Sequence, residues 1–318
     1  MFKVQDSTED NTGGDQKMIS SPIAMLPPEL MRCVISFAAA HPCEHYTILS
    51  LSQVSQSFRQ TVLDMSWLFT QADWDHWPTP LLDLWCQRAR AQSLTVNLPS
   101  LTVHRLTVGE APELKALLES YSQHWGTLTF WVLPERSDEY ERSIRFVERL
   151  LQCACPLLHT IDGWAPPRPF MNFTTTLHLH PDCLPSLHKM HMRNISFAFP
   201  TSPTSVTELE QHCSYPERWL PLLDGVKSCR LIQKLTINTM DYYGGNSITF
   251  PAASGKVVLP SLTVLELRGL APVSVAPAIS QLLSCCDIPK LESLIMWVAP
   301  RSGGPGVFKN LCQDLVRR

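Results

Sequence analysis

The chain has 318 residues, of which 44% are apolar and 17% charged, and its formal net charge is −3. This composition is typical of a folded chain with one or two domains and a sizeable core. Nucleic-acid binding calls for a basic face, which the charge balance argues against. No apolar run reaches the ~18 residues that span a bilayer. Eleven cysteines lack regular spacing and the N-terminus is polar, so we expect an intracellular protein, cytoplasmic or nuclear, with free thiols.

The N-terminal part predicts a tail and then a helical module. Residues 1–20 are almost all polar and should form a disordered tail. Residues 21–69 predict three short helices, the first beginning at Pro27 and Pro28, which fit a first helical turn. Its apolar residues recur at the spacing of one helix face, namely Leu30, Val34, Phe37 and Ala38. Fewer than 50 residues bury little apolar surface alone, so we expect another surface to cover this module.

The same module resembles an F-box. The resemblance rests on Leu26-Pro27-Pro28-Glu29-Leu30, Val34, the run Val54-Ser55-Gln56-Ser57-Phe58-Arg59, and Trp67-Leu68. Ser55 stands where the family commonly has Cys, Phe58 where it commonly has Trp, and Trp67 and Leu68 are in reversed order. The resemblance implies binding to a Skp-type adaptor, and through it to a cullin. The implied adaptor-binding residues are Leu26, Pro27, Leu30, Val34, Ile35, Leu51, Val54, Phe58 and Trp67. We expect about half of them to face inward.

A connector and a repeated pattern follow. Residues 70–80 read as a connector whose Trp74 and Trp77 should pack at the seam between modules rather than bind a ligand. Residues 81–318 repeat an apolar helix, a Pro or Gly stop, and a strand of the form Leu-x-x-Leu-x-Leu. The clear copies are centred on Met190, Leu235, Leu265 and Leu294, and weaker copies on Leu106, Leu128 and Ile161.

This second part resembles a degenerate leucine-rich repeat. The resemblance implies an α/β fold in which an irregular arc has parallel strands inside and helices outside. The ninth position of two good copies is Ile195 and Leu270 rather than Asn or Cys, so we expect no polar ladder to brace the turns. Two stretches, 197–216 and 241–255, read as insertions, and loops of such length tend to be functional or mobile.

Outward positions of the predicted strands offer a surface for a target protein. We expect target binding at His191, Arg193, Asn238, Arg268, Ile295 and Trp297. Trp297 and Ile295 would form an apolar patch of the kind that marks a partner site, and Trp164 could extend it. The alternative is an ordinary solvated sheet face.

Catalytic patterns are scarce in the sequence. It contains no nucleophile elbow, P-loop, dinucleotide fingerprint or His-Glu-x-x-His motif, and we expect neither enzymatic activity nor a cofactor. The best metal candidate combines His and Cys ligands that suit zinc, namely His178, His180, Cys183, His188 and His191. Surface histidines on two neighbouring segments account for this pattern without a metal, so we expect none.

The two resemblances together predict a substrate receptor of a Skp-cullin-F-box ubiquitin ligase. The helical module would bind the adaptor, and the repeats would bind an unknown target protein. One alternative is a repeat scaffold that lacks ligase function, with the helical module serving only as a cap. A less favoured alternative is a zinc enzyme that uses the His and Cys cluster.

Overall fold

The computed structural model describes residues 26–39, 44–71, 74, 77–98, 111–133, 137–166, 175–200, 204–212, 225–238, 256–270, 284, 286–298 and 306–308. The predicted tail, the copy centred on Leu106 and the stretch 241–255 lie outside these residues. The chain divides into two compact units, Met1–Met65 and Ser66–Arg318. Trp67, which the sequence assigned to the helical module, therefore belongs to the second unit.

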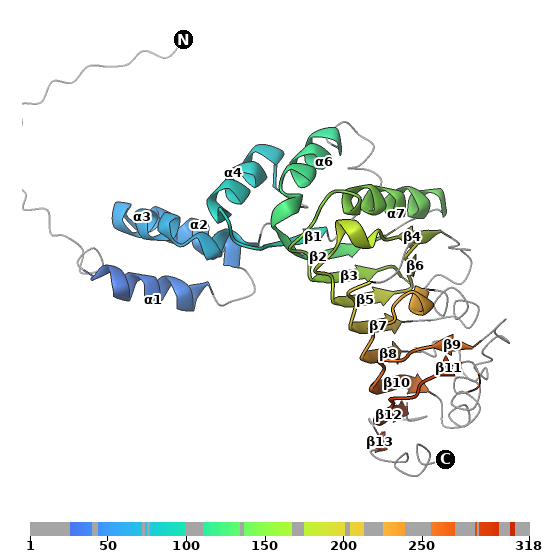
Figure 1. Ribbon diagram of the computed structural model, residues 1–318. Coiled ribbons are helices and arrows are strands. Elements are labelled where there is room, and N and C mark those ends of the chain that lie inside the picture. The colour runs from blue at the N-terminus through green and yellow to red at the C-terminus, as the bar shows by residue number, and fades with distance from the viewer. Residues whose placement is uncertain are drawn as a thin grey trace, which may run out of the picture. The chain divides into compact units, whose positions relative to one another are not determined.

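The first unit contains three helices, α1 (Pro28–Ala38), α2 (Glu44–Val54) and α3 (Gln56–Asp64), drawn in blue in Figure 1. Pro28 stands in the first turn of α1, where its missing N–H has no intrahelical acceptor to lose. Ser55 caps α3, because its Oγ accepts a hydrogen bond from the Phe58 backbone N–H at 3.2 Å. Ser is a strong N-cap residue and Cys is not. Capping of α3 therefore accounts for Ser at position 55.

The second unit begins with helical segments that precede or alternate with its first strands. They are η2 (Ser66–Phe69), α4 (Thr79–Ala89), α6 (Ala111–Ser120), η3 (Ser122–His124) and α7 (Ser137–Leu151). Helix α4 begins at Thr79, within the predicted connector. Trp77 packs edge to face on Trp85, with 4.7 Å between the ring centroids. Phe69 contacts the same indole at 4.7 Å. These rings form a core inside the second unit, so Trp77 needs no seam between modules to account for its burial.

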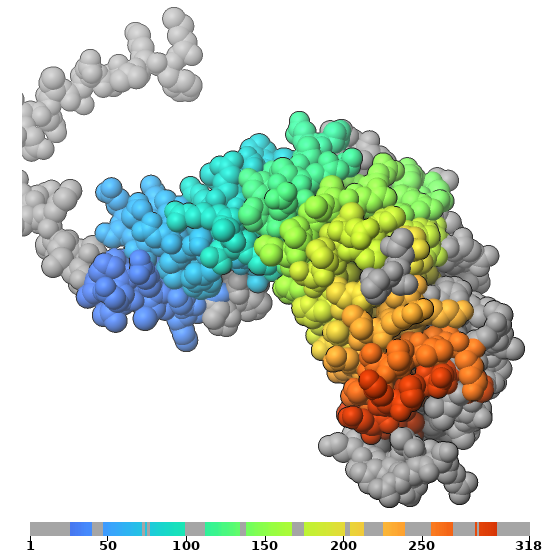
Figure 2. Space-filling model, in the orientation of Figure 1, coloured from blue at the N-terminus to red at the C-terminus, as the bar shows by residue number. Residues whose placement is uncertain are grey.

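The main sheet of the second unit has nine strands, and the chain visits them in order from one edge to the other (Figure 1). They are β1 (Leu94–Leu98), β2 (Trp125–Trp131), β3 (Thr160–Trp164), β5 (Lys189–Arg193), β7 (Glu208–His212), β8 (Lys234–Asn238), β10 (Val264–Leu270), β12 (Ser293–Val298) and β13 (Gly306–Phe308). The first eight are mutually parallel and β13 pairs antiparallel with β12. This confirms the α/β class and the parallel sheet. In Figure 2 the colours of this unit follow in chain order, as expected when each segment lies beside its sequence neighbours.

Short strands lie outside the main sheet. β4 (Thr176–His178) pairs with β6 (Ser196–Ala198), and β9 (Val257–Val258) pairs with β11 (Cys286–Asp287), each in parallel. A single turn, η4 (Pro181–Cys183), follows β4. The connections between main strands are thus ordered in part by pairing with one another.

The strand register aligns the repeated pattern across the sheet. One row of side chains directed to the core contains Val96, Leu128, Ile161, Met190, Leu209, Leu235, Leu265 and Leu294. It includes every predicted centre that the structure describes, while Val96 occupies β1. Because alternate residues of a strand point to opposite faces, the residues between them form a second face, which we call the open face.

Two sequence predictions about the turns and insertions are wrong. The stretch 197–216 contains β7, an interior strand of the sheet, so the 45-residue step between Met190 and Leu235 holds an additional strand. Buried polar groups also brace the turns: Asn194 Nδ2 donates to the Ala165 carbonyl at 3.0 Å, and Gln211 Nε2 donates to the Ile195 carbonyl at 3.2 Å. Asn194 has φ 56°, a left-handed conformation that Asn tolerates better than most residues.

Candidate binding surfaces

Helix α1 carries two apolar stripes, of which one is buried and the other is exposed. Met31 and Ile35 are buried, whereas Leu30, Val34 and Phe37 are 51%, 45% and 82% exposed. Both sets follow helical spacing, and residues one position apart differ by about 100° around the axis. The inner stripe packs in the unit, since α1 contacts both α2 and α3. The outer stripe remains an exposed apolar surface.

The nine predicted adaptor-binding residues divide between core and surface. Pro27, Leu30, Val34, Val54 and Trp67 are exposed, Leu26 and Leu51 are half-buried, and Ile35 and Phe58 are buried. Ile35 and Phe58 therefore serve the core of the bundle rather than an outer surface. The sequence prediction missed the exposed Phe37 as a surface residue, although its spacing from Leu30 and Val34 was visible.

The open face of the sheet is built from rows of side chains across neighbouring strands. Its central row contains Asn97, Thr129, Asp162, His191, Glu210, Thr236, Glu266 and Ile295. Its end row, two residues further along each strand, contains Trp131, Trp164, Arg193, His212, Asn238, Arg268 and Trp297. All six predicted target-binding residues lie in these rows. Arg193 and Trp297 are exposed, and His191, Asn238, Arg268 and Ile295 are half-buried.

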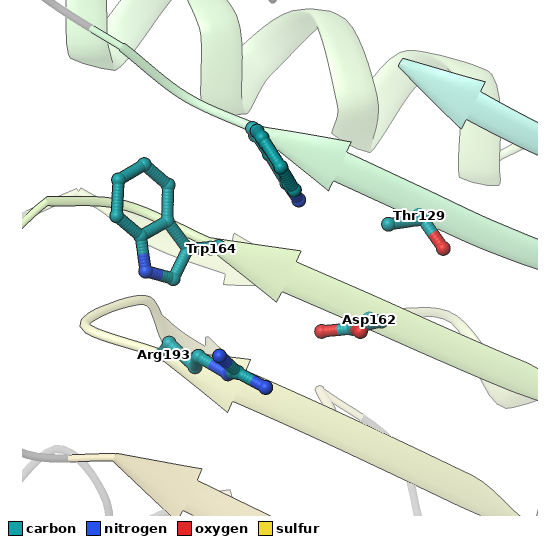
Figure 3. Close-up of a pocket in the computed structure, with 5 residues that line it drawn as sticks. Thr129, Asp162, Trp164 and Arg193 are labelled. Carbon is teal, nitrogen blue, oxygen red and sulfur yellow. The ribbon is translucent and has the colours of Figure 1, made fainter. Parts of the chain in front are cut away.

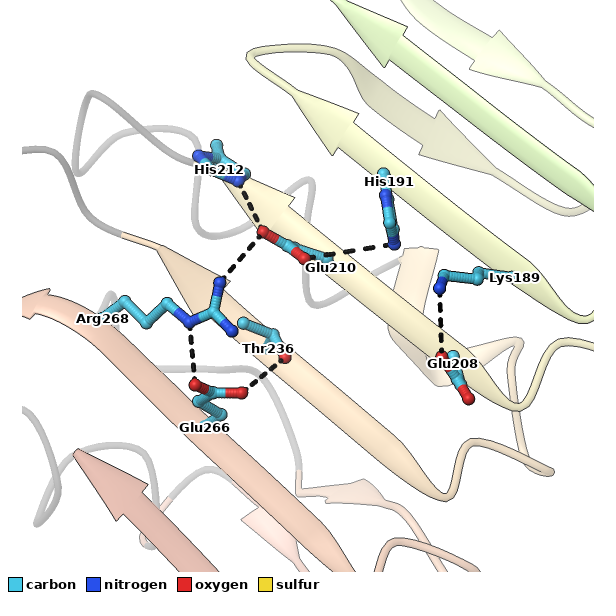
Figure 4. Close-up of polar contacts among 8 residues, drawn as sticks. All are labelled: Lys189, His191, Glu208, Glu210, His212, Thr236, Glu266 and Arg268. Carbon is cyan, nitrogen blue, oxygen red and sulfur yellow. Dashed lines mark hydrogen bonds and ion pairs between the residues drawn. The ribbon is translucent and has the colours of Figure 1, made fainter. Parts of the chain in front are cut away.

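Glu210 is the centre of a charged network on this face (Figure 4). Its Oε1 lies 2.8 Å from His212 Nε2 and 3.5 Å from Arg268 Nη1, and its Oε2 lies 4.0 Å from His191 Nε2. The hydrogen bond with His212 and the nearby positive groups lower the pKa of Glu210 to about 2, against the opposing effect of burial. Burial lowers the pKa of His191.

Glu266 extends the network toward β12. Arg268 Nε donates to Glu266 Oε1 at 2.8 Å, and the Trp297 indole N–H donates to the same oxygen at 2.6 Å. Burial opposes ionisation of Glu266, but these hydrogen bonds outweigh it and lower the pKa of the carboxyl. The sequence predicted an apolar patch formed by Trp297 and Ile295. The indole of Trp297 instead donates a hydrogen bond to a carboxylate, so the patch is not purely apolar.

A pocket lies at the opposite half of the open face, over β2, β3 and β5 (Figure 3). Its volume is about 320 Å³, and it is lined by Thr129, Trp131, Asp162, Trp164 and Arg193. The two indoles lie with ring centroids 5.8 Å apart and planes inclined by 59°. The sequence pattern pointed to Arg193 and Trp164, whereas Thr129, Trp131 and Asp162 were not predicted. The signal for these three was the alternation around the copies centred on Leu128 and Ile161.

The side chains weighed as candidate zinc ligands do not converge. Cys183 Sγ donates to the Gln152 carbonyl at 3.2 Å, while His188 stacks on His159 with centroids 5.6 Å apart. His191 instead faces Glu210 on the open face. Across the described ranges, no group of three His, Cys, Asp or Glu side chains could hold a metal ion.

The cysteines within the described ranges are free thiols. Burial raises the pKa of Cys86, Cys155 and Cys229 to about 12. These three thiols are therefore protonated and weakly nucleophilic at neutral pH.

Two comparisons with known proteins found no relative: no protein-family model matches the chain, and no curated protein does. Among the helices that the structure describes, none has both the length and the apolar character of a membrane span. The surfaces themselves therefore carry the functional argument. They comprise an exposed apolar helix stripe on one unit and a polar sheet face with an aromatic pocket on the other.

Proposed function

We propose that this chain is an F-box-type substrate receptor. In this role the first unit docks on a Skp-type adaptor of a cullin ubiquitin ligase, and the open face of the second unit binds a target protein. The chain does no chemistry itself. It raises the effective concentration of a target lysine near the ubiquitin-conjugating enzyme.

The observation that carries the proposal is the outer stripe of α1. Leu30, Val34 and Phe37 face solvent from a helix that already buries Met31 and Ile35. Fully burying such a side chain contributes about 1.5–3 kcal/mol relative to leaving it exposed. A helix with a second, unused apolar stripe is what a module that docks on a partner subunit requires. A simple cap would instead present polar groups there.

The second unit supports the other half of the proposal. Its open face runs across the parallel strands and presents charged, polar and aromatic side chains. Aromatic residues and Arg are enriched where proteins bind one another. The predicted leucine-rich-repeat architecture is consistent with the way in which the chain visits the main strands in order.

Adaptor capture tests the first step. The full chain should co-purify with a Skp-type adaptor when the two are co-expressed, and a Val34→Glu, Phe37→Glu double variant should lose at least about nine-tenths of the bound adaptor, because hot-spot truncations cost 2 kcal/mol or more. The matched control is Leu157→Glu, Leu231→Glu, which places the same charges at exposed apolar positions of the second unit.

The outcomes separate the receptor from the scaffold. Loss with the α1 variant but not with the control supports the receptor. If the wild-type chain binds no adaptor, or if the α1 variant binds as well as the wild type, the outer stripe is not the docking surface. The scaffold alternative would then be favoured. Circular dichroism of each variant checks that its helices are retained.

A further inference from the structure

The pocket over β2, β3 and β5 differs in charge from the network beside it. Glu210 and Glu266 both pair with Arg268, and Glu210 also contacts His212, all within 3.5 Å. Arg193, by contrast, is exposed and pairs with no carboxylate in the part of the chain that the structure describes. The pocket thus offers a guanidinium that is in no ion pair among the described residues, although Asp162 lines the same pocket. A guanidinium is a planar group suited to bind a carboxylate with two hydrogen bonds.

Two indoles stand next to that guanidinium in the end row. Trp131 is 46% exposed and contacts Trp164, with ring centroids 5.8 Å apart. The exposed indole of Trp131 gives an incoming ring a surface on which to pack in a tilted or offset contact. The side chains of Asp162 and Thr129 lie one row back, and Figure 3 shows them with Trp164 and Arg193 on neighbouring strands.

The dimensions favour one or two side chains of a longer chain as the occupant. A volume of about 320 Å³ is at the lower end of ligand pockets, which span about 300–1,000 Å³. Asp162 and Thr129 can accept hydrogen bonds from backbone N–H groups. Arg193 is exposed and shares its row with the indoles, whereas Asp162 is half-buried in the row behind. Because Arg193 is the more exposed of the two, its charge is the more accessible to an incoming ligand.

From this geometry we infer that the pocket binds an internal peptide segment of a partner protein, in which an acidic side chain adjoins a proline or aromatic residue. The ring packs on the exposed indole of Trp131, and the carboxylate pairs with Arg193. The segment continues past the pocket in both directions. This inference names the class of target for the proposed receptor. Binding of the segment does not depend on the proposed function, whereas ubiquitin transfer to the captured protein does.

Peptide selection on the full chain tests the inference. A random ten-residue library, displayed with both ends extended, should enrich segments that carry Asp or Glu next to Pro, Tyr, Phe or Trp. The best of these, made as a fluorescent peptide with blocked ends, is then titrated by fluorescence polarisation. Trp131→Ala and Arg193→Gln should each weaken its binding about tenfold or more, as interface hot spots do.

The controls make comparable changes elsewhere. Leu231→Ala removes an exposed apolar side chain and Arg230→Gln removes an exposed guanidinium, both outside the open face. Each should change affinity less than about twofold, within the range of neutral contacts. The enriched peptide should lose affinity when its acidic residue becomes Gln or Lys. Amidation of a free C-terminus should have no effect.

Several outcomes would overturn the inference. These are enrichment of Lys- or Arg-containing segments, absence of any acidic motif with a ring, affinity that requires a free C-terminal carboxylate, or a loss with Leu231→Ala as large as that with Trp131→Ala. Adaptor capture is measured on separate variants of the first unit. Failure of the pocket and failure of the receptor proposal can therefore be told apart.

Discussion

Gly163 lies on the core side of β3, directly beneath the pocket. A Cβ built on it would lie 2.6 Å from Phe130 Cζ and 3.0 Å from Met192 Sδ. Real Cβ atoms do not approach ring carbons so closely, so any other residue forces Phe130 out of its place. Since Thr129 and Trp131 flank Phe130 on β2, the shape of the pocket depends on this absent side chain.

Gly163→Ala should lower the free energy of unfolding by about 1–3 kcal/mol, the usual cost of overpacking a core. Urea unfolding followed by tryptophan fluorescence measures the loss. A second substitution, Phe130→Leu, removes the ring atom that conflicts with the new Cβ. Phe130→Leu should therefore lower the free energy of unfolding less in the Gly163→Ala background than in the wild type. Strictly additive losses would show that Phe130 is not the neighbour that requires glycine.

Glu210 gives the open face a defined response to acid. The carboxyl is held ionised by His212, His191 and Arg268, and its pKa is lowered to about 2 from 4.5. A lowered carboxyl pKa stabilises the folded state above the unfolded value, and that stability is lost as the pH falls from about 4.5 toward 2. The charge network thus contributes fully at neutral pH and disappears in acid.

Glu210→Gln should be less stable than the wild type at pH 7, and the difference should shrink as the pH falls below about 4.5. The cause is protonation of the wild-type carboxyl, which the amide cannot undergo. Denaturant unfolding at pH 7, 5 and 3 measures the difference. Glu292→Gln makes the same change of side chain at an exposed position and serves as the control. A gap that is constant with pH would contradict the assigned role.

At the level of elements, periodicity predicted helices and strands well but did not decide which face is buried. Leu30, Val34 and Phe37 form one apolar stripe of α1, and Met31 and Ile35 form another, rotated by one residue. Both satisfy helical spacing, and only packing against α2 and α3 selects the inner one. Sequence reasoning could therefore find the helix but not its orientation.

Strand β7 was missed for a specific reason. Its residues follow the frame Val206-x-x-Leu209-x-Gln211, so a polar side chain stands where the pattern requires an apolar one. Gln211 is buried and donates to the Ile195 carbonyl. The pocket was missed for a different reason. Trp131 and Asp162 lie far apart in sequence and come together only when β2 and β3 pair in register.

Truncation should lower stability strongly in the inner stripe of α1 and hardly at all in the outer stripe. Ile35→Ala removes a fully buried side chain and should cost about 2–5 kcal/mol, enough to unfold a small helical unit. Val34→Ala removes an exposed side chain and should change stability within about 0.5 kcal/mol. Hydrogen exchange of the amides in α1–α3 measures both effects. Equal losses would mean that Val34 is also part of the core.

At the scale of the whole molecule, the two units should differ in stability. The first unit spans Met1–Met65 and the second Ser66–Arg318, and the fraction of surface buried on folding rises with chain size. The second unit also propagates its core through eight parallel strands, each covered by neighbours. The first unit has no such array, and under the proposed function we expect a partner to cover the outer stripe of α1.

Hydrogen exchange on the full chain tests this difference. Without a partner, amides of α1–α3 should exchange at least about tenfold faster than those of β3, β5 and β8, since local opening free energies range from near zero to the global value. Saturating Skp-type adaptor should slow exchange in α1–α3 by mass action and leave the strands unchanged. Helices as protected as the strands in the free chain would mean that the first unit needs no partner to complete its core, and the outer stripe of α1 would then require another explanation.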